Sequence, residues 1–276
     1  MKKILAVALT FVMIIGLFTA CGKNSKQNSN GSETKLVHTV ELSSEDYGVG
    51  FRKGSGLAVL FNNFFVSNYE TFKNCAEKYN VADILAEQPT YELGSLDTNG
   101  NSDVEYVKNK GKLVVGITEF EPMDYKDANG NWIGFDADMA TAFAKEIGVD
   151  VEFVLIDWDN KIMELNGKSI DCVWNGMTLT DEVKSSMECS IPYCSNKQVV
   201  VVRADVADKY QTVEACKDLS FAVEAGSAGE NVAKDNGYKY TAVKDQATAL
   251  MEVRSGTSDA AIIDLTMAKA MIDNAK

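Results

Sequence analysis

From Lys112 onward, segments with the apolar pattern of strands alternate with segments that have the apolar spacing of helices. Short apolar runs such as "KLVVGI" and "VDVEFVLI" have the length and composition of buried strands. Between them, "GFDADMATAFAKEIG" places Met139, Phe143 and Ile147 at helical spacing before a glycine. A helix near residues 160–166, a strand in "SIDCVWNGMTL" and a polar helix start in "TDEVKSSM" come next. This order predicts a β-α-β-α block.

A second block of the same kind follows. "VVVVRA" has the pattern of a strand, and "LSFAVEAGSAGENVAKDNG" that of a strand, a glycine-rich turn and a helix. "QATALMEVRSG" and "DAAIIDLTMAKAMI" then predict helix, strand, helix. A parallel sheet that ends on a helix is short of one element, so we expect another part of the chain to complete it.

Residues 43–79, "SSEDYGVGFRKGSGLAVLFNNFFVSNYETFKNCAEKY", read like the end of a domain although they come early. They predict a short strand, a basic turn and a long amphipathic helix with a break near Asn68. The segment "QPTYELGSLDTNGNS", residues 88–102, has the composition of a connector. The apolar residues of the helix that share one face are Leu57, Leu60, Phe61, Phe64, Phe65, Phe72, Cys75, Ala76 and Tyr79.

Composition changes this picture little. The 276 residues are 46% hydrophobic, enough for a sizeable core, and the net charge is −13. An acidic chain without clustered lysine and arginine is unsuited to bind nucleic acid or anionic lipid through its surface.

The N-terminus has a targeting pattern. Two lysines precede an apolar run, residues 4–18, that suits a signal peptide better than a membrane span, and "FTAC" follows. Small residues before Cys21 resemble a bacterial lipobox, so residues 1–21 are interpreted as a lipoprotein signal peptide that leaves Cys21 lipidated. Ordinary cleavage near Ala20 with Cys21 free is the alternative. Residues 22–34 have the composition of a flexible tether, which predicts a folded part outside the cytoplasmic membrane.

Five further cysteines show no C-x-x-C pair and no spacing to the single histidine, His38, that would hold a metal. Buried small hydrophobic residues are the preferred interpretation, with a disulfide between Cys189 and Cys194 as the alternative. We predict no metal and no cofactor. The cysteines are Cys75, Cys172, Cys189, Cys194 and Cys216.

Several ordered blocks resemble the family 3 extracellular solute-binding proteins, the polar amino acid receptors of ABC importers. They are "GKLVVGITEFEPMDYKDANGNWIGFDADMATAFAKEIGVDVEF", "SIDCVWNGMTLTDEV", "AVEAGSAGE" and "SDAAIID". The resemblance implies an α/β, periplasmic-binding-protein-like fold of type II, with two lobes joined by two hinge crossings. It also implies a small solute bound in the cleft, ABC transporter membrane subunits as partners and a place on the extracellular face of the cytoplasmic membrane, anchored through lipid on Cys21.

The order of the blocks departs from the family. The segment resembling "DYGVGFRKGS" and its long helix comes last in ordinary members and first here, which implies a circular permutation. Lobe 1 is then residues 47–196, including the connector, and lobe 2 is residues 35–46 plus 197–276. We expect Leu36 and Val37 to be buried in the sheet of lobe 2. The alternative is an added N-terminal module, residues 36–88, beside a truncated receptor.

The resemblance also implies a set of ligand contacts. Asp264 suits an ammonium group, and the turn at residues 227–229 opens a helix whose amides suit a carboxylate. Two positions depart from the family: Val183 stands where a carboxylate-binding arginine is expected, and Ala228 replaces a threonine. Lys184 does not substitute, because its helical position turns it away. The expected ligand-binding residues are Phe120, Trp158, Asn175, Gly176, Met177, Thr178, Glu224, Ser227, Ala228, Gly229 and Asp264.

These contacts predict an amine-bearing solute, first a polar or basic amino acid and second an amine whose carboxylate is altered or missing. Two other classes stay open. One is a dehydratase of the kind that acts on cyclohexadienyl substrates on this fold, although the sequence offers no Ser-His-Asp, Cys-His or metal pattern and we expect no enzyme. The other is a ligand-sensing surface lipoprotein that is not coupled to uptake.

Overall fold

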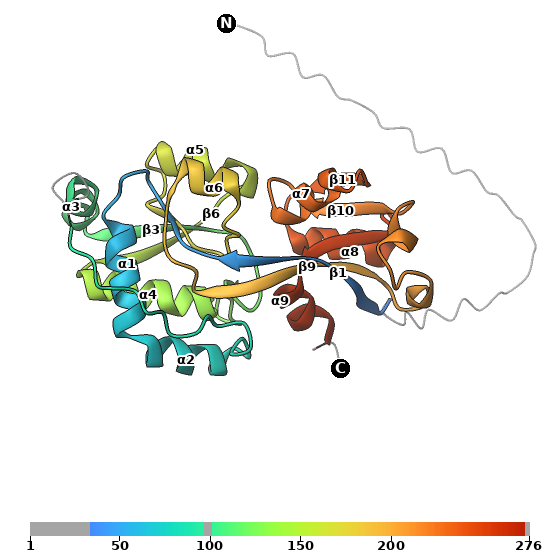
Figure 1. Ribbon diagram of the computed structural model, residues 1–276, viewed down its shortest axis with the longest axis horizontal. Helices are drawn as coiled ribbons and strands as arrows, with labels where there is room; N and C mark the ends of the chain where they lie inside the picture. Colours follow the sequence, from blue (N-terminus) through green and yellow to red (C-terminus); the bar gives the residue numbers. More distant parts are fainter. Residues whose placement is uncertain (1–33, 97–100, 274–276) are drawn as a thin grey trace, which may run out of the picture. The chain divides into compact units, whose positions relative to one another are not determined.

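Two five-stranded sheets organise residues 34–96 and 101–273, the residues that this computed structural model describes (Figure 1). We call the sheet that contains residues 112–117, with its helices, the first lobe, and the other sheet with its helices the second lobe. Each sheet mixes parallel and antiparallel pairs. The expected lipidation site, Cys21, lies outside the described residues.

The first lobe combines early and central segments of the chain. Its strands, in spatial order, are β6 (Asp150–Leu155), β3 (Lys112–Ile117), β7 (Cys172–Val173), β2 (Gly50–Phe51) and β8 (Glu188–Cys189). A separate hairpin joins β4 (Tyr125–Lys126) and β5 (Trp132–Ile133). The helices are α1 (Leu57–Ser67), α2 (Tyr69–Lys78), α3 (Asn101–Lys110), α4 (Phe135–Ile147), α5 (Lys161–Asn166) and α6 (Asp181–Ser186), with a 3-10 turn η1 (Trp158–Asn160).

The second lobe is built on strands β1 (Leu36–Tyr47), β9 (Cys194–Arg203), β12 (Ala260–Asp264), β10 (Ser220–Glu224) and β11 (Lys239–Val243), in that spatial order. Its apolar faces are covered by helices, as α/β layering requires. These are α7 (Ala228–Asp235), α8 (Gln246–Ser255) and α9 (Leu265–Ala268), with short turns η2 (Ala207–Lys209) and η3 (Glu214–Cys216) and a π-helical turn η4 (Lys269–Asp273).

The long strands β1 and β9 pair antiparallel along most of their length and carry the chain between the lobes (Figure 1). At their far ends, Tyr47 pairs with Thr178 and Cys194 pairs with Leu85, both in the first lobe. The N-terminal strand thus supplies the edge of the second sheet. Leu36 is buried there as expected, whereas Val37 is only half-buried.

The early segment is part of the core of the first lobe. Strand β2 lies between β7 and β8, and α1 and α2 pack on α4. Phe61 stands edge-on to Trp174 with ring centroids 4.9 Å apart, and it also contacts Phe143. The predicted break in the helix is at Asn68, whose backbone N–H and side-chain Nδ2 both donate to Phe64 O and so end α1.

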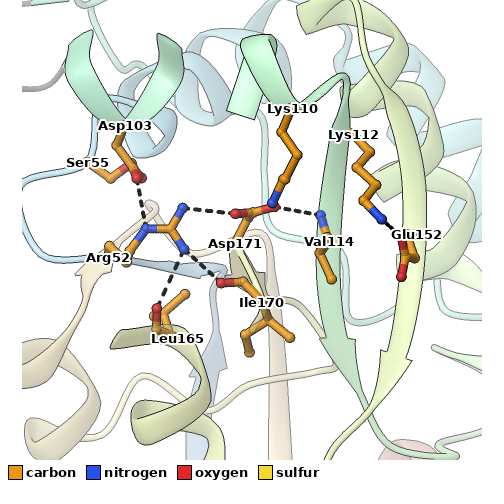
Figure 2. A network of polar contacts seen from close by, with 10 residues as sticks. All are labelled: Arg52, Ser55, Asp103, Lys110, Lys112, Val114, Glu152, Leu165, Ile170 and Asp171. Atoms are coloured by element: carbon orange, nitrogen blue, oxygen red, sulfur yellow. Dashed lines mark hydrogen bonds and ion pairs between the residues drawn. The ribbon is translucent and has the colours of Figure 1, made fainter. Parts of the chain in front are cut away.

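A buried ion network ties the early segment to the rest of the first lobe (Figure 2). Arg52 donates from Nε to Asp103 Oδ1 at 2.7 Å and from Nη2 to Asp171 Oδ1 at 2.9 Å. Asp171, fully buried, also accepts from Lys110 and from the backbone N–H of Val114. Because these residues come from the β2–α1 turn, α3, β3 and the approach to β7, the network joins segments far apart in sequence.

Two expectations need correction. The connector was placed at residues 88–102, but α3 begins at Asn101, and neither α3 nor β11 was predicted. The alternative of a Cys189–Cys194 disulfide is wrong, since the cysteines of the described residues are free, and Cys189 is half-buried while the other four are buried.

In the part of the chain that the structure describes, no helix has the length and hydropathy needed to cross a membrane.

Candidate functional site

A small pocket lies where the carboxyl ends of strands from both lobes meet, the edge at which α/β proteins bind ligands. Phe120 follows β3, residues 175–178 follow β7, and η1 and α5 contribute Trp158 and Lys161. The second lobe supplies the turn after β10, the start of α8 and the end of β12. The cavity is about 30 Å³, which is room for about one water molecule.

Ten of the eleven sequence-predicted contacts line this pocket; Gly229 does not. Gly229 instead packs against β12, where an added Cβ would lie 2.8 Å from Ile262 O, so its role is close helix–strand packing. The ten residues that the structure brings together are Phe120, Trp158, Asn175, Gly176, Met177, Thr178, Glu224, Ser227, Ala228 and Asp264.

Asp264 is a highly coordinated carboxylate. It accepts hydrogen bonds from Tyr47 Oη at 2.6 Å, Gln198 Nε2 at 3.1 Å, and the side-chain amides of Asn196 and Gln246. Burial, reinforced by the negative charge of Glu45, raises the pKa of Asp264, while the donors from Tyr47 and Gln246 act in the opposite direction. Oδ1 accepts three of these hydrogen bonds and Oδ2 accepts one, so protein groups already use much of the hydrogen-bonding capacity of Asp264.

Glu224 is the less satisfied acid of the pocket. Its side chain is buried, Oε1 has no hydrogen-bond partner among the described residues, and Oε2 accepts one long bond of 3.5 Å from Gln246 Nε2. Burial raises the pKa of Glu224 to about 8, and the charge of Asp264 adds to this effect. A cation entering the pocket would therefore find an unpaired carboxyl oxygen at Glu224.

Two buried acids, Asp124 and Asp136, accept hydrogen bonds from the loop after β7. The side-chain oxygen of Asn175 accepts hydrogen bonds from Thr118 N and Oγ1. Its side-chain nitrogen donates to Asp124 Oδ2 and to Thr118 O. Gly176 N donates to Asp136 Oδ2 at 2.7 Å. An added Cβ at Gly176, whose φ is +53°, would lie 2.6 Å from Phe120 Cε1. The side-chain amide of Asn175 is therefore committed within the first lobe, and Gly176 adds no side chain to the pocket.

The two lobes touch at the mouth of the pocket. Lys161, on the first lobe, donates from Nζ to Gly226 O of the second lobe at 2.8 Å and to Trp158 O at 3.2 Å. Gly226 has a φ of +70°, and a Cβ there would lie 2.7 Å from Asp159 Cα. Such close approach across the cleft indicates a closed arrangement of the lobes, in agreement with the small cavity.

Sequence reasoning missed several residues that line the pocket. Lys161 and Gln246 are buried, although lysine and glutamine are commonly exposed. The signal that could have found Lys161 is its position one helical turn after Trp158, which the resemblance did identify. The missed lining residues are Lys161, Thr180, Glu182, Gly226, Asn231 and Gln246.

Two known binding proteins are similar in sequence to more than half of this chain. The ArtP protein of Bacillus subtilis (strain 168), an arginine-binding extracellular protein, is 29% identical over 175 residues, 62% of this chain and 68% of that protein. The L-cystine-binding protein TcyJ of Escherichia coli (strain K12) is 28% identical over 161 residues, 57% of this chain and 60% of that protein. The chain thus spans less than two thirds of the length of TcyJ.

Solved structures give the same fold. The holo form of ArgBP from T. maritima has 34% sequence identity and a TM-score of 0.58, covering 61% of this chain and 76% of that one. The ancestral amino acid-binding protein AncCDT-1, described as a precursor of cyclohexadienyl dehydratase, has 37% identity and a TM-score of 0.56, covering 58% and 73%. The model of the bacterial extracellular solute-binding proteins, family 3, matches residues 113–252, half of the chain. The chain belongs to this family of bacterial extracellular solute-binding proteins.

Proposed function

We propose that this protein binds an amine-bearing solute, first a polar or basic amino acid, in the pocket between its lobes. The observation that carries the proposal is the unpaired Oε1 of buried Glu224, a residue that lines the pocket together with Asp264. A buried carboxyl oxygen without a partner is costly, and an ammonium group relieves that cost through a charge-assisted hydrogen bond. Phe120 and Trp158 supply ring surfaces for an aliphatic stem or a cation.

The relatives support the amino acid as first candidate, because ArtP is named for arginine and TcyJ for L-cystine. The second candidate is an amine whose carboxylate is altered or missing, since Val183 stands at the position where the resemblance expects an arginine. Family membership supports the further proposal that the protein delivers its ligand to the membrane subunits of an ABC importer.

Thermal-shift measurements over amino acids, polyamines and betaines test the proposal. A ligand present at 100 times its Kd adds about 2.7 kcal/mol to the free energy of unfolding. We expect amine-bearing solutes to stabilise the protein; stabilisation by sugars, anions or metal ions alone would contradict the proposal. Conversion of a bound cyclohexadienyl substrate would instead favour the dehydratase, and binding without any effect on uptake would favour a sensor.

We also propose that the chain is anchored to the extracellular face of the cytoplasmic membrane through lipid on Cys21, with residues 22–34 as tether. A diacylated cysteine supplies two acyl chains, which suffice for stable membrane binding. Replacing Cys21 with Ala should release the protein into the soluble extracellular fraction. Continued retention at the membrane in cell fractionation would count against the anchor.

We further propose that the order of elements is circularly permuted, with residues 47–196 as lobe 1 and residues 35–46 plus 197–276 as lobe 2. The pairing of β1 with β9, and of β2 with β7 and β8, supports this division. The alternative, an added module beside a truncated receptor, gives no reason for the early segment to supply an inner strand and part of the aromatic core of the first lobe.

A further inference from the structure

Lys161 is the one basic residue among the described residues that line the pocket. Its side chain is buried, with 7% of the residue exposed. The described residues give its ammonium group two acceptors, the carbonyls of Trp158 and Gly226, and both are uncharged. The ammonium group also lies over the Trp158 ring, 5.0 Å from its centroid. A lysine ammonium has three N–H donors, so one donor has no oxygen acceptor among the described residues.

This arrangement leaves a positive charge without a counter-charge in direct contact. Glu182 and Glu224 act on Lys161 from a distance, but neither forms an ion pair with it among the described contacts. Burying an ammonium group away from water is unfavourable unless an anion pairs with it. An anion that enters the pocket would therefore be attracted to Lys161.

The pocket thus presents a basic group and an acidic group from opposite lobes, and neither forms an ion pair among the described contacts. Lys161 belongs to α5 of the first lobe, and Glu224 ends β10 of the second. Val183 adds no charge, so no arginine competes with Lys161 for a carboxylate. A solute that carries both an ammonium group and a carboxylate satisfies Glu224 and Lys161 together, whereas a polyamine leaves Lys161 unpaired and adds a repulsive charge beside it.

We propose that Lys161 Nζ binds the carboxylate of the ligand and so restricts the ligand to zwitterionic amino acids. This inference rests on the proposed function and narrows it, because amines without a carboxylate are excluded. Lys161 also donates to Gly226 O across the cleft, so binding of the carboxylate and contact between the lobes involve the same ammonium group.

The test compares each amino acid with its decarboxylated amine: arginine with agmatine, histidine with histamine and lysine with cadaverine. Isothermal titration calorimetry measures both Kd values for the pair that binds best. We expect the wild-type protein to prefer the amino acid by at least about tenfold, because a charge-assisted contact to the carboxylate is lost in the amine. Binding of the amine as tightly as the amino acid would overturn the proposal.

Three variants separate this specificity role from a purely structural one. Lys161→Met keeps the length of the side chain without its charge, and we expect the preference to fall below about threefold. Lys161→Arg keeps the charge and should retain most of the preference. Lys184→Met removes an exposed lysine of α6 and should leave the preference unchanged.

A structural role of Lys161 alone would weaken binding of the amino acid and of the amine by the same factor in Lys161→Met, and that result would overturn the proposal. The thermal stability of each unliganded variant is measured alongside, so that a folding defect is recognised. If the wild-type protein bound no amine-bearing solute, the proposed function itself would fail, and Lys161 would lose its assignment with it.

Discussion

Asp264 and Glu224 line the same pocket, but their hydrogen bonding gives them different roles. Four side-chain donors surround the carboxylate of Asp264, from β1, β9 and α8. Tyr47 is among these donors and is fully buried. Glu224, by contrast, has an oxygen without a partner. Asp264 therefore holds the elements around the cleft together, and Glu224 is the acid that keeps free hydrogen-bonding capacity.

Replacing Asp264 with Ala should lower the free energy of unfolding by about 3 kcal/mol or more, because several buried donors lose their acceptor. Affinity for a confirmed ligand should also fall at least about tenfold. Glu224→Gln should weaken affinity to a similar degree without lowering stability, because Glu224 has few contacts to lose. Chemical denaturation measures the stability of both variants, and isothermal titration calorimetry measures their affinity for the ligand. Equal stability of the two variants would argue against it.

The raised pKa of Glu224 predicts a pH dependence of stability. Burial and Asp264 raise this pKa from 4.5 to about 8, so the folded protein keeps a proton that the unfolded chain releases. The stability that Glu224 contributes is fully present below pH 4.5 and is lost as the pH rises through about 8. In that window the loss is about 1.4 kcal/mol per pH unit.

Burial also raises the pKa of Asp136, to about 7, and this group therefore adds a further loss of stability as the pH rises. The comparison is therefore between unliganded wild-type protein and Glu224→Gln, denatured at about pH 6 and about pH 8. We expect the wild-type protein to lose more stability than the variant over this interval. Parallel pH profiles would show that Glu224 does not titrate in this window.

Much of the site was predictable from sequence because the relevant residues belong to short motifs next to strand ends. Phe120, Thr178 and Ser227 follow recognisable strand–turn patterns, and all three line the pocket. Lys161 was not predictable in the same way. Its burial depends on the approach of Gly226, 65 residues later in the chain, and lysine is commonly exposed. The occupation of Asp264 by four donors likewise depends on pairings across both lobes.

The elements were predicted best where apolar periodicity was strong. The break between α1 and α2 at Asn68 and the end of α4 before Gly148 follow from the pattern and from local turn residues. Helix α3 was missed because Val104 and Val107 are the buried residues among those of its side chains that the structure describes, so its apolar face is short and its sequence is mostly polar. Strand β11 was missed for the same reason, as an edge strand that is largely exposed.

The ion network of Figure 2 explains how α3 is held despite its small apolar face. Arg52 joins Asp103 of α3 to Asp171, and both contacts are buried or nearly so. Replacing Arg52 with Met leaves Asp171 without one of its two cationic partners and should lower the free energy of unfolding by about 3 kcal/mol. Lys112 and Glu152, an exposed pair on the same sheet, provide the control.

Lys112→Met should change stability very little, because exposed ion pairs are screened by water and salt. Chemical denaturation of both variants measures the difference between the buried network and the exposed pair. If Arg52→Met were as stable as Lys112→Met, the network would not be what holds α3 to the lobe.

Taken as a whole, residues 34–276 form one compact unit in which early and late segments are interleaved. The second sheet has β1 from the start and β12 from the end of this unit, and β1 contacts the turn η4. The first sheet has β2 from the early segment between two later strands. The connector after α2 is therefore the covalent link between the early segment and the strands that it pairs with in the first lobe, and hydrogen bonds between β1 and β9 hold the same segment to the second lobe.

A reordered chain tests the permutation directly. It begins with residues 101–273, continues through a short glycine and serine linker, and ends with residues 34–88. The junction is feasible because η4 and β1 are in contact, and surface loops tolerate such rearrangement. Since every strand pairing and the buried aromatic core are retained, we expect the reordered chain to fold and to bind the same ligand within about threefold of the original affinity.

Deletion of residues 34–88 is the matched control. It removes β1 and β2 and uncovers Trp174 and Phe143, which pack against Phe61 of α1. Loss of this much buried apolar surface should abolish cooperative thermal unfolding, because the contribution of a large aromatic core residue is about 3 to 5 kcal/mol and several would be lost. A deletion variant that unfolded cooperatively and bound the ligand would show that the early segment is an added module. In that case the receptor would be complete without it, and the reordered chain would gain nothing from carrying the segment at its end.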